Sequence, residues 1–329
     1  MIALALSLAL AGPTLTDDLF TLHDPAITES SAVVEVGRGP DHRVLTINDS
    51  GDGPVVYVLD PRTGRTVGRS SYDGDAVDVE ALAPGLGGEV WVGDIGDNGA
   101  VRADVQLYRL PALKDGDREV PSTRYDLVYR GGARDAETLL VQPRTGRVFV
   151  VSKSFFGGKV YAAPRDLRAD RPNQLVPVGP APAVVTDGAF FPDGRHVVLR
   201  DYSRAYVLDT TRLPWRRVDS FELPDQPQGE GVAVRRGGRS LLVSTEGEAQ
   251  PVQVVPVPAR VLAELEPPTP TSTPQVRDEE QPSRLEALTQ DGAVPWTLVG
   301  GIVGVCALLG LGFRLRRVRA ARRRSRSTR

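Results

Sequence analysis

Residues Asp78–Asn98 read DVEALAPGLGGEVWVGDIGDN, and they contain the pattern on which the rest of the chain is built. A short apolar run begins at an acid, Glu80, and is followed by a Pro/Gly turn. A second apolar run, rich in Val, then ends at another acid, Asp94. Short apolar runs bounded by Pro and Gly predict two β-strands joined by a turn.

This pattern is found five times along the chain. The acids that open the first strand of each repeat are Glu29, Glu80, Glu137, Asp187 and Glu230, and the residues that close the second strand are Asp49, Asp94, Lys153, Asp201 and Glu246. Successive opening acids are 51, 57, 50 and 43 residues apart. A repeat of this length, made of strands and turns alone, predicts a β-propeller with one blade per repeat.

The last repeat lacks a strand that the first four repeats have. It contains three strand patterns, at Gly231–Val234, Ser240–Ser244 and Gln253–Val257. A further strand pattern, Leu19–His23, precedes the first repeat. Lending this strand to the last blade would close the ring and remove the free sheet edges. We therefore predict an all-β fold, a five-bladed β-propeller that is closed by its N-terminal strand.

The propeller is predicted to occupy residues 17–260. Residues 1–16 contain an apolar run with a small-x-small site, which predicts a signal peptide and hence export. Residues 261–294 are rich in Pro and Thr, then acidic and poor in apolar residues, which predicts a disordered stalk.

A membrane anchor is predicted after the stalk. Residues 295–313 carry no charge, and a helix of this length spans about 28 Å, close to the hydrocarbon thickness of a bilayer. Residues 314–329 contain nine Arg and no acid. Basic residues beside a span mark its cytoplasmic side, so we expect a single-pass protein of the cell membrane with the propeller outside and this tail in the cytoplasm.

The charge balance limits the partners. The formal net charge is −2, but residues 1–313 carry about −11 because the nine tail Arg are included in the total. An acidic folded part excludes nucleic acid as a partner. A single cysteine, Cys306, excludes an intrachain disulfide and a cysteine-based zinc site. Three Lys against 37 Arg are typical of a GC-rich, actinobacterial genome.

The opening acids are expected to meet at one mouth of the central channel. In a blade, the start of the first strand and the end of the antiparallel second strand lie at the same end of the molecule. Carboxylates gathered there cannot all ionise without a metal, shared protons or another cation. Oxygen ligands without His or Cys favour calcium over zinc. The predicted calcium ligands are Glu29, Glu80, Glu137, Asp187 and Glu230.

The same acids have a structural interpretation, in which they accept hydrogen bonds from neighbouring amides and shape the loops. Further residues predicted at the mouth are Asp49, Asp52, Asp94, Asp97, Lys153, Arg200, Asp201 and Glu246. Lys153 could neutralise part of the acid ring, and Arg200 with Arg204 could meet an anionic ligand or pair with adjacent acids. The chain has no Gly-x-Ser-x-Gly motif and no Gly-Lys-Ser/Thr phosphate loop.

Two resemblances follow from these residues. The phrases Glu-Ser-Ser at 29–31, Asn-Asp-Ser-Gly-Asp at 48–52 and Val-Gly-Asp-Ile-Gly-Asp-Asn at 92–98 resemble those of uncharacterised exported bacterial β-propellers. The ring of one acid per blade resembles the five-bladed calcium-activated nucleotidases, or apyrases. In that family one strand-opening residue per blade, mostly Glu with Ser in one or more blades, holds a central calcium.

The resemblance implies that the same five positions hold calcium here, although Asp187 stands where that family has a small hydroxyl. The family's substrate-facing basic and aromatic residues are not matched, so nucleotide hydrolysis is not implied. A looser likeness to acidic propeller phytases and their esterase-like relatives has the same limit.

Two functions are therefore predicted from different classes. The first is a non-catalytic, membrane-anchored extracellular module that binds a ligand or a protein partner, with calcium at its centre. The alternative is a calcium-dependent phosphoester hydrolase, nucleotidase-like or phytase-like. In the hydrolase, Asp49, Asp94, Asp201 or Glu246 would activate a water molecule beside the metal.

Overall fold

A computed structural model of the chain describes residues 17–49 and 52–266. Within them lie 21 strands, two short 3-10 helices (Gly39–Asp41 and Leu86–Gly88) and one α-helix. The strands are β1 (Asp17–Thr21), β2 (Ser30–Val36), β3 (Arg43–Asn48), β4 (Val55–Leu59), β5 (Thr66–Tyr72), β6 (Val79–Pro84), β7 (Val90–Asp94), β8 (Val105–Leu110), β9 (Arg118–Val120), β10 (Thr123–Tyr129), β11 (Ala136–Val141), β12 (Val148–Ser152), β13 (Lys159–Ala162), β14 (Asn173–Pro180), β15 (Asp187–Phe190), β16 (His196–Arg200), β17 (Arg204–Asp209), β18 (Arg216–Glu222), β19 (Gly229–Val234), β20 (Ser240–Thr245) and β21 (Pro251–Pro256).

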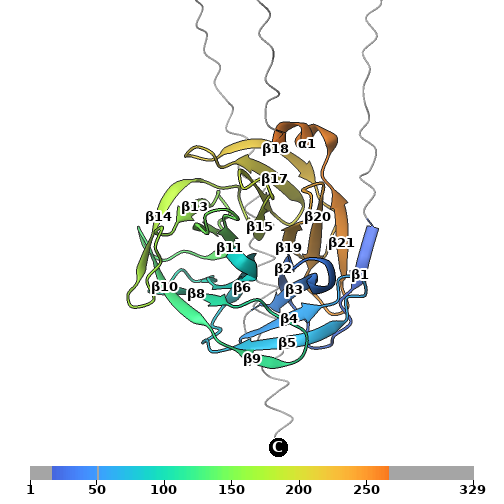
Figure 1. Ribbon diagram of the computed structural model, residues 1–329. Coiled ribbons are helices and arrows are strands. Elements are labelled where there is room, and N and C mark those ends of the chain that lie inside the picture. The colour runs from blue at the N-terminus through green and yellow to red at the C-terminus, as the bar shows by residue number, and fades with distance from the viewer. Residues whose placement is uncertain (1–16, 50–51, 267–329) are drawn as a thin grey trace, which may run out of the picture. The chain divides into compact units, whose positions relative to one another are not determined.

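The described residues form a β-propeller. The strands β2, β6, β11, β15 and β19 contact one another in a closed cycle, and they lie nearest the centre in Figure 1. From each of them an antiparallel series runs outward, for example from β15 through β16 and β17 to β18. Outer strands such as β10 alternate buried and more exposed residues, as half-buried strands do, whereas β12 and β16 are buried along their whole length.

The N-terminal strand completes the series that starts at β19. Strand β1 pairs antiparallel with β21, with Asp17 opposite Val254, and the amide of Leu22 donates to the Gln250 carbonyl at 2.9 Å. Figure 1 shows the blue strand β1 beside the orange strand β21. The strand predicted at Leu19–His23 is thus found at Asp17–Thr21, two residues earlier.

Two parallel pairings at the periphery were not predicted. The short strand β9 pairs with β5, and β10 pairs with β14, which joins eight strands into one sheet. The outer strand of a blade has an unpaired edge, and an added strand satisfies its backbone groups. A three-residue strand such as β9 carries no period that sequence reasoning could detect.

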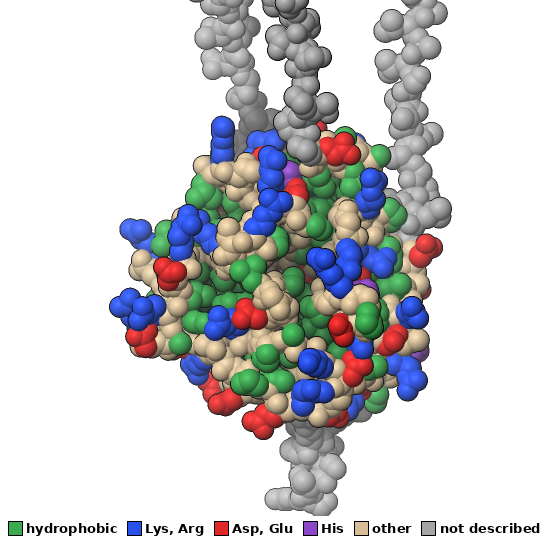
Figure 2. Space-filling model, in the orientation of Figure 1, with side chains coloured by type: hydrophobic (Ala, Val, Ile, Leu, Met, Phe, Trp, Pro, Cys, Tyr) green, Lys and Arg blue, Asp and Glu red, His purple; other side chains and the backbone are tan. Residues whose placement is uncertain are grey.

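Hydrophobic side chains fill the space between neighbouring series. Between the series of β6 and β11, Trp91 stacks on Tyr125 with ring centroids 5.5 Å apart, and Tyr129 meets Tyr161 edge-on at 4.9 Å. The C-terminal ends of the inner strands are also apolar. They surround a small cavity of about 90 Å³ whose lining includes Leu82. The face seen in Figure 2 is mostly green and tan at its centre, with charged side chains mainly toward its rim.

A helix follows the last strand and corrects the predicted stalk boundary. Helix α1 (Ala259–Leu265) buries Val261 against the cluster that contains Phe221 and Val257, and Arg260 pairs with Asp219 at 2.8 Å. The stalk was predicted to begin at residue 261, but the apolar face of this helix packs on the propeller through residue 265.

The other predicted segments fall outside the described residues. These are the signal peptide (1–16), the stalk from residue 267, the span (295–313) and the tail (314–329). Among the helices that the structure describes, none has the length and apolar character needed to cross a bilayer.

Candidate functional site

The positions that face the channel mouth are set by a recurring irregularity near the start of the inner strands. The pairing register shifts between Ser30 and Ala32 in β2, and the residue passed over is Ser31. Equivalent shifts pass over Glu80 in β6 and Glu137 in β11, and a longer one in β19 includes Glu230. A bulge of this kind re-aims a side chain, and such bulges concentrate at functional sites.

The register corrects one member of the predicted acid ring. The shifts make Ser31, Glu80, Glu137 and Glu230 equivalent. Strand β15 has no shift, and its first paired residue, Asp187, takes the fifth position. Ser31 is buried, and its Oγ donates to the carbonyl of Glu80 at 2.9 Å and to Glu80 Oε2 at 3.1 Å. The ring positions are thus four acids and one Ser rather than five acids.

Glu29, predicted as the first ring acid, stands two residues earlier and is exposed. Its carbonyl accepts from the amide of Asp49 at 2.9 Å. The carbonyls of Asp78, Asp135 and Gln228 make the same contact in other repeats. Glu29 therefore stands in line with Asp78, Asp135 and Gln228, two residues before the ring position. The prediction placed it in the ring because the sequence does not reveal the extra residue of the bulge.

The ring acids are buried and interact with one another. Burial, and then the charges of Glu137 and Asp49, raise the pKa of Glu80 well above its usual range. Burial raises the pKa of Glu230 to about 7, although Lys153 and Arg200 oppose the shift. Glu246 follows β20, and burial together with the charge of Glu230 raises its pKa to about 8. Acids of different inner strands thus interact with one another.

Lys153 is placed among these acids. Its Nζ forms an ion pair with Glu137 Oε1, and it lies 5.3 Å from the centroid of the Tyr202 ring. Burial lowers the pKa of Lys153, but the charges of Glu137 and Glu230 more than offset that effect and raise it. Burial still holds the pKa of Glu137 well above its usual range. The predicted neutralising role of Lys153 is consistent with this ion pair.

The tightest carboxylate group lies between the first two inner strands. Each of Asp49, Asp78 and Glu80 offers an oxygen atom, and these atoms lie within 4.8 Å of one another. Gly96 closes the group, because a Cβ there would lie 2.6 Å from Asp78 Cγ and 2.8 Å from Glu80 Oε1. Oxygen-only donors suit calcium, magnesium or manganese.

Asp78 was not predicted as a site residue. Its signal was available, since Asp78 and Glu80 are separated by one residue at the start of a strand and point to the same side in extended backbone. A pattern of one acid per blade does not include it.

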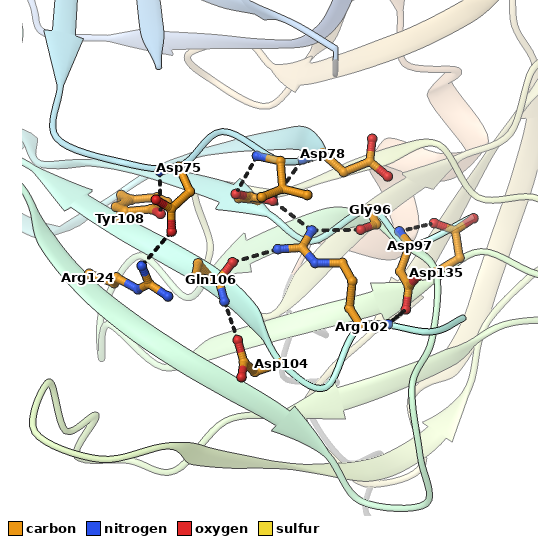
Figure 3. A network of polar contacts seen from close by, with 12 residues as sticks. Asp75, Asp78, Gly96, Asp97, Arg102, Asp104, Gln106, Tyr108, Arg124 and Asp135 are labelled. Carbon is orange, nitrogen blue, oxygen red and sulfur yellow. Dashed lines mark hydrogen bonds and ion pairs between the residues drawn. The ribbon is translucent and has the colours of Figure 1, made fainter. Parts of the chain in front are cut away.

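Two predicted mouth residues instead hold the loop between β7 and β8 (Figure 3). The Asp94 carboxylate is fully buried and accepts from the amides of Val77 and Asp78 at 3.0 Å and from Arg102 Nη1 at 2.7 Å. The Asp97 carboxylate accepts from the amides of Val101 and Arg102, both at 2.9 Å. These contacts occupy both carboxylates and support the structural interpretation for them.

Arg102 is the centre of this network and was missed by sequence reasoning. Its guanidinium also donates to the Gly96 carbonyl at 2.8 Å and to Gln106 Oε1 at 2.6 Å. The network therefore fixes Gly96 against the carboxylate group. A lone Arg in a loop gives no signal of this role.

Arg200 and Asp201 are also structural. Arg200 is fully buried and donates to the carbonyls of Gly231 at 3.0 Å and Ser244 at 3.3 Å, so it joins β16 to the last series. Asp201 accepts from the amide of Arg204 at 2.7 Å and from the Tyr206 hydroxyl at 2.7 Å. The suggestion that Arg200 meets an anionic ligand is wrong, because its donors are directed into the protein.

The remaining predicted residues have local partners. Asp52 accepts from the side chain of Asn48. Asp187 Oδ2 accepts from the amide of Val232 at 2.7 Å, and its Oδ1 has no hydrogen-bond partner among the described residues. Burial raises the pKa of Asp187 well above its usual range. Asp187 thus links β15 to β19 from inside the ring.

Comparisons with known proteins identify no family for this chain. No protein-family model and no curated protein matches the sequence. Similar solved structures include a luciferin-regenerating enzyme (12% identity, TM-score 0.41, 70% of this chain and 78% of that chain) and a glucose dehydrogenase (16%, 0.41, 70% and 84%). A third is the soluble aldose sugar dehydrogenase of Escherichia coli (11%, 0.43, 74% and 99%). At such low identity and TM-score, nothing about substrate or cofactor follows for this chain.

Proposed function

We propose that the chain is a five-bladed β-propeller that binds calcium at its acidic mouth and serves as an extracellular module for binding a ligand or a protein partner. The closed cycle of β2, β6, β11, β15 and β19 supports one blade per inner strand. The pairing of β1 with β21 supports closure by the N-terminal strand.

The observation that carries the calcium proposal is the group Asp49, Asp78 and Glu80, whose oxygen atoms lie within 4.8 Å of one another. We place the cation there rather than at all five ring positions. Glu137 is already paired with Lys153, and Asp187 accepts from a backbone amide. Calcium takes six to eight oxygen ligands, so water and nearby carboxylates such as Glu230 would complete its shell.

Thermal unfolding of the full chain tests this proposal. A ligand that binds only the native state raises Tm in proportion to its free concentration over Kd. Calcium is expected to raise Tm, and a chelator is expected to reverse the rise. Glu80→Gln and Asp78→Asn should abolish the rise, whereas Asp170→Asn, at an exposed acid away from the mouth, should leave it intact. A calcium response that persists in both mouth variants would overturn the site.

The membrane anchor rests on the sequence alone. An uncharged run of 19 residues followed by nine Arg supports a single span at 295–313 with an outside propeller. Protease added to intact cells should remove the propeller and spare the basic tail. One tag inserted between the predicted signal peptide and residue 17, and a second tag at the C-terminus, follow the two parts. Protection of the propeller until the cells are lysed would contradict the orientation.

A calcium-dependent phosphoester hydrolase is the second candidate, and one observation favours it. The pKa values of Glu230, about 7, and Glu246, about 8, lie near neutrality beside the carboxylate group. A general base or acid works best when its pKa is near the working pH. Asp94, by contrast, is unsuited to activating water because its carboxylate is fully engaged.

Assays with nucleotides, phytate and aryl esters distinguish the two candidates. A hydrolase predicts calcium-dependent turnover that Glu246→Gln reduces about 100-fold or more while Tm is kept. A wild-type protein that shows the calcium-dependent Tm rise but hydrolyses none of these substrates would leave the binding module as the function.

A further inference from the structure

Large exposed hydrophobic side chains gather at the acidic end of the propeller. The described residues include seven of them, and five belong to loops at that end: Val77, Val101, Phe155, Phe156 and Tyr202. Only Leu86 and Leu213 lie in loops at the opposite end. We call the first five residues the apolar crescent. Exposed apolar groups concentrated on one face are typical of an interaction site.

The crescent's aromatic pair is presented on a fixed turn between β12 and β13. Phe155 is 74% exposed and Phe156 is fully exposed. The amide of Val184 donates to the Ser154 carbonyl at 3.0 Å, and the amide of Gly158 donates to the Pro182 carbonyl at 3.1 Å. Both ends of the turn are thus bonded to the segment that leads to the next blade. Little conformational entropy remains to be lost when a partner covers these rings.

A cavity of about 650 Å³ lies beside this turn. Its lining includes Phe155, Phe156 and Tyr202, and also Asn98 and Ala100 of the β7–β8 loop. Lys153 also lines it, so the cavity opens next to the Lys153–Glu137 pair and hence next to the acids of the mouth. The size is that of a site for a few side chains.

Carboxyl groups outnumber basic groups at the mouth beside the crescent, and a nearby cation would favour their ionised form. The interacting acids there are Glu29, Asp49, Asp78, Glu80, Glu137, Glu230 and Glu246. Lys153 and Arg200 oppose them. A cationic side chain is therefore the complement of the mouth, and opposite charges across an interface set its specificity.

We propose that the acidic end binds a segment of a partner protein that presents apolar side chains next to a Lys or Arg. The apolar side chains pack on Phe155, Phe156 and Tyr202 in the cavity, and the basic side chain reaches the acids of the mouth. This inference rests on the proposed function as a binding module and names the chemistry of its partner. Buried aromatic anchors of this kind contribute most of the affinity in protein interfaces.

A random peptide library displayed on phage, panned against the full chain with calcium present, tests the inference. Enriched peptides are expected to carry Lys or Arg flanked by apolar residues. The double variant Phe155→Ser/Phe156→Ser should weaken synthetic versions of these peptides about tenfold or more. Leu213→Ser, at an exposed residue of the opposite end, is the matched control and should bind like the wild type.

Several results would overturn the inference. Arg134 and Lys159 also line the cavity, and if they selected the ligand the enriched peptides would be acidic. The inference would also be contradicted if the Phe155→Ser/Phe156→Ser variant enriched the same peptides as well as the wild type does, or if no peptide were enriched on the wild type. The calcium-dependent Tm rise, measured on the same samples, separates the two proposals. If basic peptides bind but calcium does not raise Tm, only the calcium site is contradicted. If calcium raises Tm but no peptide binds, only the proposed partner is contradicted.

Discussion

The two ends of the central channel are built from the same five strands and differ in almost every physical respect. The inner strands begin with a polar residue at the ring, such as Glu80, and end mostly with apolar residues, such as Leu82 and Ala83, with Glu35 of β2 as an exception. At one end, buried carboxylates raise one another's pKa. At the other end, Val, Leu and Phe side chains surround a cavity of about 90 Å³.

Because of this difference, one end of each inner strand contributes to stability and the other end is suited to binding. Apolar burial at the far end stabilises the propeller without any partner. Buried carboxylates at the mouth destabilise it unless a cation compensates their charge. The mouth is therefore where a ligand changes the free energy of unfolding, and the far end is where it should not.

The largest effect is expected from Lys153→Met. This change leaves Glu137 buried without its ionic partner, which costs about 3–5 kcal/mol of unfolding free energy near pH 8. The loss should shrink toward pH 5, because the raised pKa of Glu137 favours its protonated form as the pH falls, and that form needs no ionic partner. Urea unfolding at the two pH values measures it. Lys159→Met, at an exposed Lys for which no ion pair is described, serves as control, and equal losses in the two variants would contradict the prediction.

A cavity-forming change at the far end should dissociate stability from calcium. Leu139 is fully buried and lines the apolar cavity, so Leu139→Ala is expected to cost about 2–4 kcal/mol. The calcium-dependent rise in Tm should stay as large as in the wild type. Leu86→Ala, at an exposed Leu of the same end, should change stability by less than about 0.5 kcal/mol. A lost calcium response in Leu139→Ala would show that the two ends are coupled.

The pH dependence without calcium follows from the mouth acids. The pKa of Glu230 is raised to about 7 and that of Glu246 to about 8, from 4.5 for an ordinary Glu. At a pH between the ordinary pKa and these raised pKa values, the folded state binds more protons than the unfolded state. The free energy of unfolding therefore falls as the pH rises from about 5 to 8. The expected fall is on the order of 1–3 kcal/mol in chelator.

Calcium should remove this slope, because it stabilises the ionised carboxylates. Chemical unfolding at several pH values, with chelator and with calcium, measures both slopes. Glu230→Gln/Glu246→Gln should flatten the slope in chelator. Stability that rises with pH in chelator would mean that these carboxylates are ionised in the folded state at neutral pH.

Sequence reasoning reached the repeat, the strand order and the gathering of acids at one end, because these follow from a period of about 50 residues and from antiparallel pairing. It did not reach the residues that need tertiary information. Arg102 and Arg200 gain their roles only from carbonyls and carboxylates that the fold brings to them. The bulge that selects Ser31 over Glu29 leaves no mark in the sequence, since either residue could open a strand.

The smallest effect is expected from Ser31→Ala, and it tests whether Ser31 or Glu29 is the ring residue of β2. Ser31→Ala removes the donor to the carbonyl and the carboxylate of Glu80, and is expected to cost about 1 kcal/mol of unfolding free energy. Without that hydrogen bond the pKa of Glu80 should rise further, so calcium should raise Tm less. Glu29→Gln, two residues earlier and exposed, should stay within about 0.5 kcal/mol and keep the calcium response. Denaturant unfolding and calcium-dependent melts of both variants measure these effects. The reverse order, with Glu29 the sensitive position, would restore Glu29 to the ring and shift the register of β2 by two residues.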